Sequence, residues 1–509
     1  MNLTRRTNII NFLATGLSKF YNLIAVIIFT PFYIEYLGIE SFAIVSGAIV
    51  INAVLGMLDS GISPLIMRDI AKSNSSTCEK MRVLGSYELV YIVIFFFLWG
   101  LYAVFSELNL LVGFLDYSEK YSAMFEYSGI FILEFCFQLI CRFYISALQG
   151  MGRHILANSL YMGMALLRTG LLVIILAYLP TLEAFFYWQL LVSFCCFFIF
   201  RVVVYSDEGQ HINNPFRYSG LLLGRLLSLR KISLIAIISV IYSQIDRIVF
   251  FMSADLIEFP LYTVAGSFSL IITSVGLILL PLVLPMASEI DCEKKKFILL
   301  RLSHTTCWFL SAIVSVHMWI SGSSLLSVFF TDPQIAHKAS QYLNLLIIGG
   351  FLSSLTIALY ISNIAVSRFN HHLIIISLIA VIAFPVYFLF EEALGLIGIP
   401  TAFVVLQALL TGSYVLFSFK KTSRKVSFFN FVIVPLIVIS LMMIVDHLIM
   451  EFIHSFALLN SFHPYLKFCI TIIPLTLIAY SAFPLVYRLG WRNNLKADIL
   501  ALSNQEFKL

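Results

Sequence analysis

Four basic side chains lie inside long apolar stretches of the sequence: Lys19, Arg142, Arg168 and Arg247. A charged side chain near the centre of a bilayer costs about 2.5 to 3.5 kcal/mol on the insertion scale, so it is expected to face a wet interior rather than lipid. Ammonium and guanidinium groups attract phosphate, and guanidinium adds paired hydrogen bonds to it. The four residues therefore predict a cationic passage for an anionic cargo.

The four cations stand at different depths, about 10 to 22 Å from one end of their stretches at 1.5 Å per residue. Such a series suits a phosphate-bearing cargo, because each charge that leaves water needs a new partner. One opposite charge at about 4 Å, with an effective dielectric near 20, supplies about 4 kcal/mol. The alternative is that each cation pairs with a carboxylate inside the membrane and only fixes helix packing.

Uncharged polar side chains recur at helical spacing on the same stretches, and we expect them to line the passage. They are Asn11, Thr15 and Asn22 near Lys19, Gln138 near Arg142, Asn158 near Arg168, and Ser243 near Arg247. Three acidic residues also fall inside apolar stretches: Glu88, Glu134 and Asp246. They are candidates for proton or sodium coupling, because carboxylates within membranes are common relay groups. Their alternative role is to balance the cations.

The composition requires a membrane to surround these residues. Of the 509 residues, 60% are hydrophobic and only 12% are charged, which excludes a soluble domain. Hydropathy predicts an all-α polytopic membrane protein with about fourteen transmembrane helices. They cover residues 9–33, 41–65, 83–112, 121–148, 156–179, 183–200, 232–252, 262–287, 304–329, 341–365, 373–390, 396–418, 429–452 and 468–487.

Basic residues set the predicted orientation. Of the 32 lysines and arginines, 25 lie in the segments on the N-terminal side of the membrane, so both termini are predicted to be cytoplasmic. The net charge of +5 belongs to these loops and does not indicate a nucleic-acid partner. Eight cysteines and ten histidines show no metal-ligand spacing, so we expect neither a metal nor a cofactor.

The spans repeat at an offset of about 220 residues, which indicates an internal duplication. It predicts two pseudo-symmetric six-helix lobes, residues 1–205 and 232–420, with the cargo site between them. Residues 206–231 would form a cytoplasmic linker that lies on the membrane surface, or an early start of the seventh span. Residues 421–509 would add two further helices, which we expect to extend the lipid-facing surface, and a cytoplasmic tail.

Four short stretches resemble one family of membrane proteins. They are Tyr33–Ser46 (YIEYLGIESFAIVS), Leu58–Lys72 (LDSGISPLIMRDIAK), Ala147–Asn158 (ALQGMGRHILAN) and Gln244–Phe250 (QIDRIVF). In these the chain resembles the Wzx-type polysaccharide flippases of the MOP superfamily, which also contains the MATE exporters and the lipid II flippases.

The resemblance implies a MATE-like, V-shaped pair of lobes around a cationic cavity. It implies a flippase that moves an undecaprenyl-diphosphate-linked oligosaccharide, such as an O-antigen repeat unit, from the cytoplasmic to the outer leaflet by alternating access, without covalent chemistry. It also implies the bacterial inner membrane, contact with its phospholipids, a place in lipopolysaccharide biosynthesis and other polysaccharide assembly proteins as candidate partners.

Two other functions remain open. A MATE-like, ion-coupled exporter of small molecules would share the architecture, but its cavity should be acidic. A membrane glycosyltransferase or polymerase would need a sizeable external loop with catalytic residues, and the predicted external loops stay within about fifteen residues.

Overall fold

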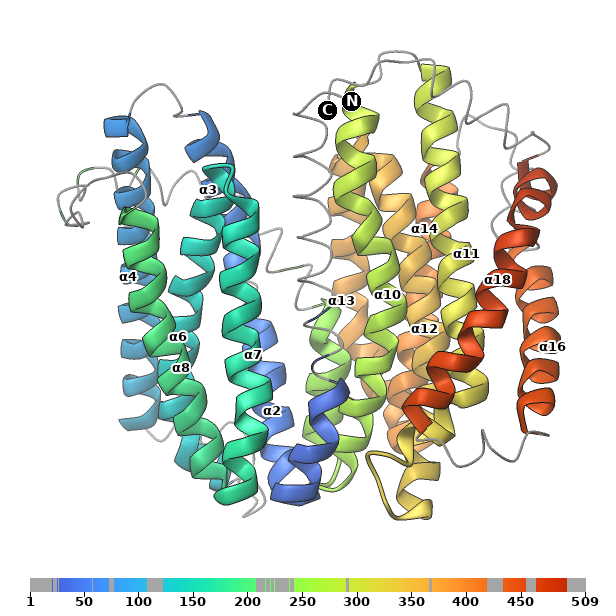
Figure 1. The fold of residues 1–509 in the computed structure, drawn as a ribbon, viewed down its shortest axis with the longest axis horizontal. Helices are drawn as coiled ribbons and strands as arrows, with labels where there is room; N and C mark the ends of the chain where they lie inside the picture. Colours follow the sequence, from blue (N-terminus) through green and yellow to red (C-terminus); the bar gives the residue numbers. More distant parts are fainter. Residues whose placement is uncertain are drawn as a thin grey trace. The chain divides into compact units, whose positions relative to one another are not determined.

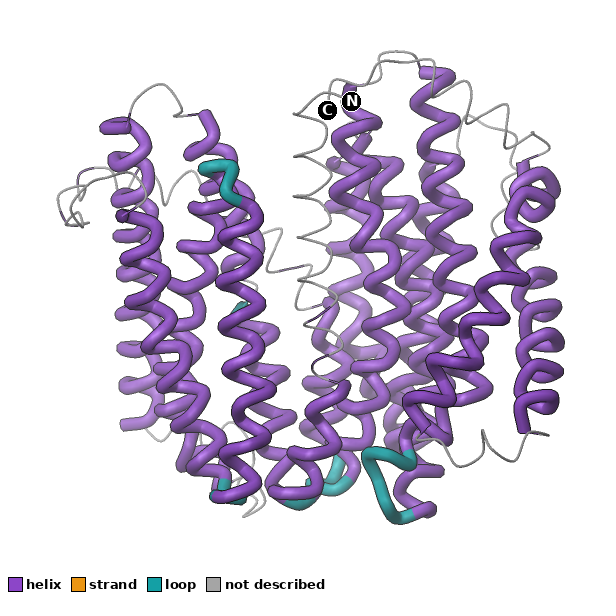
Figure 2. Tube along the Cα trace, viewed as in Figure 1, coloured by secondary structure: helices purple, strands orange, loops and turns teal. Residues whose placement is uncertain are grey.

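A computed structural model of the chain is helical in every regular element that it describes (Figure 2). The described residues are 21, 25, 27–56, 58–72, 77–107, 122–206, 216, 220, 224, 238, 242–289, 293–365, 369–418, 434–454 and 464–491. Helices suit a chain in lipid, because they satisfy their backbone hydrogen bonds internally. The predicted all-α fold class is confirmed.

The chain forms two compact units, Met1–Pro260 and Leu261–Leu509. In the first unit, the helices are Ile27–Leu37, α2 (Ile39–Leu55), α3 (Leu58–Lys72), α4 (Thr77–Glu107), α6 (Ser122–Gly150), α7 (His154–Tyr178), α8 (Leu182–Ser206) and a helix over 242–253. The predicted linker 206–231 falls outside the described residues except for Ser206, Phe216, Gly220 and Gly224, so the predicted lobe boundaries stay predictions.

Helix α6 is central to the first unit, and it packs against α2, α3, α4, α7 and α8 (Figure 1). Its Phe135, Leu139 and Phe143 recur every four residues, lie on one side of the helix and are buried. Tyr91 of α4 meets Phe143 with 5.1 Å between ring centroids. This packing fixes the rotation of α6, and with it the direction of the polar residues between the apolar ones.

The helix predicted over residues 41–65 is divided in two. Helix α2 ends at Leu55, Gly56 follows as a turn, and α3 begins at Leu58. A side chain from another helix contacts this break: Nη1 of Arg142 on α6 donates a hydrogen bond of 3.1 Å to the carbonyl oxygen of Gly56. A hydropathy average passes over such a break, since both halves are apolar.

The helices of the second unit are α10 (Glu258–Glu289), α11 (Glu293–Leu326), α12 (Pro333–Ala365), α13 (Phe369–Leu394), η3 (Gly395–Ile397), α14 (Gly398–Ser418), α16 (Val434–His454) and α18 (Pro464–Trp491). Helix α12 packs against α11 and α14, and α13 packs against α14. At Gly350 of α12 an added Cβ would lie 3.0 Å from the backbone oxygen of Ser269, so glycine permits the close approach of α10.

Helices α16 and α18 pack against each other and against α11 (Figure 1). A cluster of buried apolar side chains joins them, including Trp308 and Ile313 of α11, Met442 of α16 and Leu475 of α18. The other side of the pair carries exposed Leu441 and Leu477, 58% and 65% exposed, which suits a lipid-facing surface. In the described part of the chain, nine helical stretches are long and apolar enough to cross a membrane. The predicted total of fourteen stays a prediction, because parts of several spans fall outside it.

Candidate functional site

Two of the four predicted cations meet at one cavity in the first unit. Arg142 projects from α6 and Arg168 from α7, and both line a cavity of about 110 Å³. Gln138, Tyr161 and Thr169 contribute hydrogen-bonding groups to the same lining. The volume is roughly that of four water molecules in the liquid. The cavity therefore combines two guanidinium groups with neutral donors and acceptors, as an anion site requires.

The charge of Arg168 is paired with Glu134 of α6. Its Nη1 lies 2.5 Å from Oε1 of Glu134, and the two side chains are 15% and 4% exposed. Ser193 of α8 donates a hydrogen bond of 2.8 Å to the same carboxylate oxygen and accepts one of 3.1 Å from Arg168. Within the described part of the chain, Nη1 of Arg168 donates both hydrogen bonds of the guanidinium, so Nε and Nη2 have no acceptor there.

The charge of Arg142 has no carboxylate partner in the part of the chain that the structure describes. Its Nη2 donates a hydrogen bond of 2.9 Å to Oε1 of Gln138, one turn earlier on α6, and its Nη1 bonds to the carbonyl oxygen of Gly56. Among the residues that the structure describes, no carboxylate makes an ion pair with it. A half-buried cation that is solvated only by neutral oxygens retains its attraction for an anion.

A second cavity of about 190 Å³ shares Arg168 and Thr169 with the first. Its lining is mostly apolar, with Phe131, Phe185 and Phe186 among the walls. The other polar residues of its lining are Thr30, Tyr33, Asn52, Glu134 and Gln189. Arg168 therefore borders both a small polar cavity and a larger, largely apolar one.

Of the other two predicted cations, only Arg247 can be placed, and it is not among the residues that line either cavity. Lys19, with Asn11, Thr15 and Asn22 of its stripe, lies outside the described residues. Arg247 is half-buried on the helix over 242–253, where its Nη1 makes a long hydrogen bond of 3.4 Å to Gln244. Asp246 is buried beside it and Ser243 is exposed, while Asn158 is buried on α7 and is not among the lining residues of either cavity. The series of four cations across the membrane stays a prediction.

Glu88 is buried in a separate network that joins α4, α6 and α8. Its Oε1 accepts a hydrogen bond of 2.7 Å from the hydroxyl of Tyr144 and lies 3.0 Å from Nε of Arg201. Its Oε2 accepts a hydrogen bond from Tyr205. A carboxylate with two hydroxyl donors, a guanidinium beside it and 1% exposure is well placed to hold three helices together, which supports the packing alternative for this residue.

Sequence reasoning missed several groups at the site. Gln189 and Ser193 lie four residues apart on α8, so a search for polar pairs at helical spacing would have found them. The carbonyl of Gly56 leaves no such signal, because it is available only where the helix breaks. In the described part of the chain, no group of three or more His, Cys, Asp or Glu side chains is placed to hold a metal ion.

No family model and no curated protein sequence matches this chain. Solved structures do match it. The lipid II flippase MurJ in an inward closed conformation has a TM-score of 0.71 at 16% identity, over 94% of this chain and 99% of that chain. The chain has the fold of that structure. A multidrug resistance MATE family transporter of the MOP superfamily, facing inward, matches with a TM-score of 0.66 at 13% identity, over 79% of this chain and 96% of that one.

The MATE transporter ClbM in complex with Rb⁺ has the same fold, with a TM-score of 0.55 at 12% identity, over 82% of this chain and 95% of that chain. The fold expected from the four short sequence stretches is thereby confirmed. MurJ is matched over almost its whole length and over almost all of this chain, which includes α16 and α18.

Proposed function

We propose that this protein is a flippase for a lipid-linked oligosaccharide, and that the diphosphate of the lipid carrier binds at Arg142 and Arg168. The observation that supports it most is the convergence of two arginine side chains on one cavity, one of them with no carboxylate partner among the described residues. The match to a structure described as a lipid II flippase agrees with the proposal.

The chemistry of the site suits a diphosphate. Arg142 holds only neutral oxygens, so a phosphate oxygen can replace either of them with a gain in electrostatic attraction. Arg168 keeps Nη1 on Glu134 and offers its other nitrogens. Hydroxyl groups of the sugar would exchange hydrogen bonds with Gln138, Tyr161 and Thr169, while the oligosaccharide extends beyond this small cavity.

The wider proposal is a transport cycle in a bacterial inner membrane, with both termini in the cytoplasm. The undecaprenyl-diphosphate-linked oligosaccharide, an O-antigen repeat or a similar unit, would load from the cytoplasmic leaflet and leave to the outer leaflet by alternating access. Other proteins of polysaccharide assembly would supply and consume it. The predominance of basic residues on one side of the predicted spans supports this orientation.

The second candidate is a MATE-like exporter of small molecules. The larger cavity favours it, because its aromatic walls and Glu134 suit a small organic cation. The carboxylate of Glu134 is already neutralised by Arg168, however, and the smaller cavity carries positive charge. A cationic drug would be repelled there, so the flippase is the better supported function.

Reconstituted vesicles can separate the two functions. The full-length protein is placed in vesicles with undecaprenyl diphosphate that carries a fluorescent oligosaccharide, and a membrane-impermeant quencher reports which leaflet holds the label. We expect the protein to speed the exchange between leaflets and to leave the efflux of ethidium unchanged. Ethidium efflux without exchange of the lipid would contradict the proposal. Restored surface glycan in a strain that lacks its own flippase would test it in cells.

The glycine at the break of the second span offers a selective test of Arg142. A Cβ at Gly56 would lie 2.3 Å from Nη1 of Arg142, so Gly56→Ala should displace the guanidinium. A charge-assisted hydrogen bond contributes about 1.5 to 3 kcal/mol, and 1.4 kcal/mol is tenfold in binding. We therefore expect diphosphate affinity to fall about tenfold or more, measured by the concentration of inorganic diphosphate that protects the protein from thermal unfolding.

The protein should remain folded in this variant, because Gly56 has φ −61°, which alanine also adopts. The closest obstruction is the tip of a flexible side chain, and the carbonyl oxygen of Asn52, 2.9 Å from the added Cβ, requires only a small local shift. Gly163→Ala on α7 is the matched control, since a Cβ there meets nothing within 4 Å. Equal affinity in the two variants would show that the position of Arg142 does not matter for the anion.

A further inference from the structure

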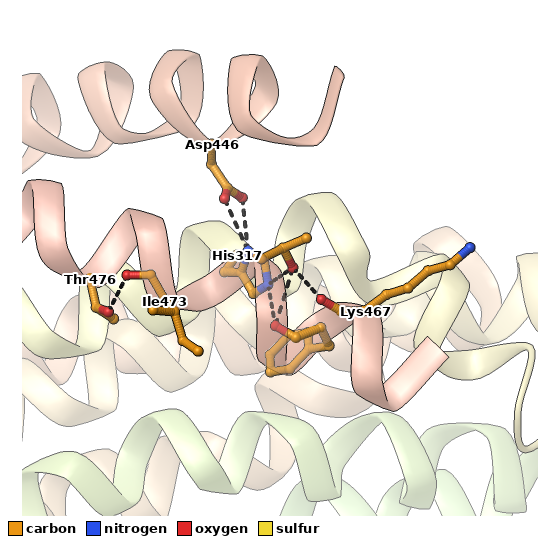
Figure 3. Close-up of polar contacts among 7 residues, drawn as sticks. His317, Asp446, Lys467, Ile473 and Thr476 are labelled. Atoms are coloured by element: carbon orange, nitrogen blue, oxygen red, sulfur yellow. Dashed lines mark hydrogen bonds and ion pairs between the residues drawn. The ribbon is translucent and has the colours of Figure 1, made fainter. Parts of the chain in front are cut away.

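A buried polar cluster joins three helices of the second unit, away from the site described above. It consists of His317 on α11, Asp446 on α16 and Thr471 on α18 (Figure 3). The side chains of His317 and Asp446 are both 0% exposed. The cluster lies at the junction where the last two helices meet α11. Apolar side chains form much of that junction, and Nε of Arg301 on α11 donates a second buried hydrogen bond of 2.9 Å to the hydroxyl of Tyr487 on α18.

Each nitrogen of the His317 ring faces oxygen atoms. Nδ1 lies 3.0 and 3.1 Å from the two carboxylate oxygens of Asp446. Nε2 lies 2.9 Å from Oγ1 of Thr471 and 3.2 Å from the carbonyl oxygen of Phe468. The hydroxyl of Thr471 has its own acceptor, the carbonyl oxygen of Lys467 at 2.8 Å. Among the described residues, the ring is the only donor to Asp446.

These contacts indicate how many protons His317 and Asp446 hold together. A carbonyl oxygen only accepts, so the contact of Nε2 with Phe468 is favourable when that nitrogen carries hydrogen. The contact of Nδ1 with Asp446 then needs a second proton, either on the ring or on the carboxyl group. In both arrangements the pair has no net charge. Without that proton, one negative charge would remain in a site that water does not reach, which is unfavourable.

We propose that His317 and Asp446 form a proton-binding site that fastens α16 and α18 to α11 while the proton is held and loosens them when it leaves. In lipid, apolar helix surfaces gain little by meeting each other, so a single buried polar contact has a large share in the association. The cluster provides such a contact to both helices, since His317 bonds to Asp446 on one side and to α18 on the other.

Among the side chains that the structure describes on the surrounding helices, the other titratable groups do not face the pair. On α16, His447 and Glu451 are 67% and 66% exposed and lie 3.5 Å from each other. On α18, the amino group of Lys467 points away from the ring (Figure 3). On α12, Leu343 lies beside Gly322 of α11 and Ser354 beside Cys307, so the stretch Leu343–Ser354 runs along the part of α11 that holds His317. This stretch contains no titratable residue.

On α11 itself, the nearest described titratable side chain is Cys307, ten residues earlier and so about 15 Å along the helix, where its thiol contacts Ser354 of α12. Under the orientation proposed above, α11 starts at the cytoplasmic side with Glu293, and His317 lies 24 residues further on, which places the pair toward the outer leaflet. The proton would then be exchanged with the external side.

Distances between spin labels can test this proton-dependent contact between α11 and α16 without any cargo. The labels are attached to unnatural amino acids at Leu310 of α11 and Leu448 of α16, both lipid-exposed at 43% and 57%, in the full-length protein in lipid nanodiscs. We expect one narrow distance at about pH 5, and a longer or broader distribution at about pH 9, with the slope of a single proton. A label pair at Ile348 and Leu409, on α12 and α14, is the control that should not change.

The double variant His317→Leu with Asp446→Leu should keep α16 close at every pH, since apolar residues replace the buried pair. A pH-independent distance in the unsubstituted protein would overturn the proposal, and so would the same pH dependence in the double variant. Should the double variant fail to fold, Thr471→Val removes one hydroxyl and is expected to shift the midpoint of the transition. An unshifted midpoint there would also count against the cluster. Because no lipid-linked sugar is used, these results stand apart from those of the flippase assay.

Discussion

The variant Arg168→Ala is expected to abolish oligosaccharide delivery and to destabilise the first unit. Arg168 compensates Glu134, whose side chain is 4% exposed. Removing one member of a buried ion pair costs about 3 to 5 kcal/mol, because the other charge stays in place. The same guanidinium lines both cavities, so the anion site loses half of its positive charge at the same time. Surface glycan and the thermal unfolding of the purified protein measure the two effects.

A double variant separates these effects. Glu134→Gln together with Arg168→Gln removes both charges and keeps groups that can hydrogen bond to each other and to Ser193. We expect this protein to be nearly as stable as the original and still inactive in delivery. Arg68→Ala is the matched control, because Arg68 is 56% exposed and its pair with Asp69 is a surface contact worth about 0 to 1 kcal/mol. Normal delivery by the double variant would remove Arg168 from the proposed anion path.

The second large effect is expected at Glu88. Glu88→Ala removes the carboxylate that accepts hydrogen bonds from Tyr144 and Tyr205 and that lies 3.0 Å from Nε of Arg201. By the same reasoning, the free energy of unfolding should fall by about 3 to 5 kcal/mol. Thermal unfolding in detergent measures this loss, and the amount of protein in the membrane is expected to fall with it.

The conservative variant decides between packing and ion coupling at this position. Glu88→Gln keeps one acceptor oxygen for the network, so we expect a smaller loss of stability and normal delivery per folded molecule. Glu107→Gln, at the exposed end of α4, serves as the control for a change of charge on the same helix. A well-folded Glu88→Gln protein that delivers no oligosaccharide would show that the proton-accepting carboxylate itself is needed.

The positions of most helices could be predicted from the sequence, and most of their contacts could not. Long apolar runs in lipid have only one regular backbone structure open to them, so hydropathy located α16 and α18 within a few residues. The same average over a window missed the break at Gly56. Hydropathy also predicted that the helix with Asp446 faces lipid, whereas the side chain of Asp446 is fully buried.

Partners across helices are harder to predict for a physical reason. Helical periodicity gives the face on which a residue lies, but not the helix that this face meets. Arg168 and Glu134 are 34 residues apart, and His317 and Asp446 are 129 apart. Arg201, the residue after the predicted span 183–200, lies 3.0 Å from the carboxylate of Glu88. The polar stripe of α6 correctly placed Gln138 beside Arg142, because both lie on one helix.

The hydrogen bond from Arg142 to Gly56 links occupancy of the cavity to the backbone of the second span. The nitrogen that holds this carbonyl also faces the space where the diphosphate would sit. If a phosphate oxygen takes it over, the C-terminal end of α2 loses its tether to α6. Binding of the diphosphate would then make the contact between α2 and α6 more flexible, and its release would make that contact rigid again.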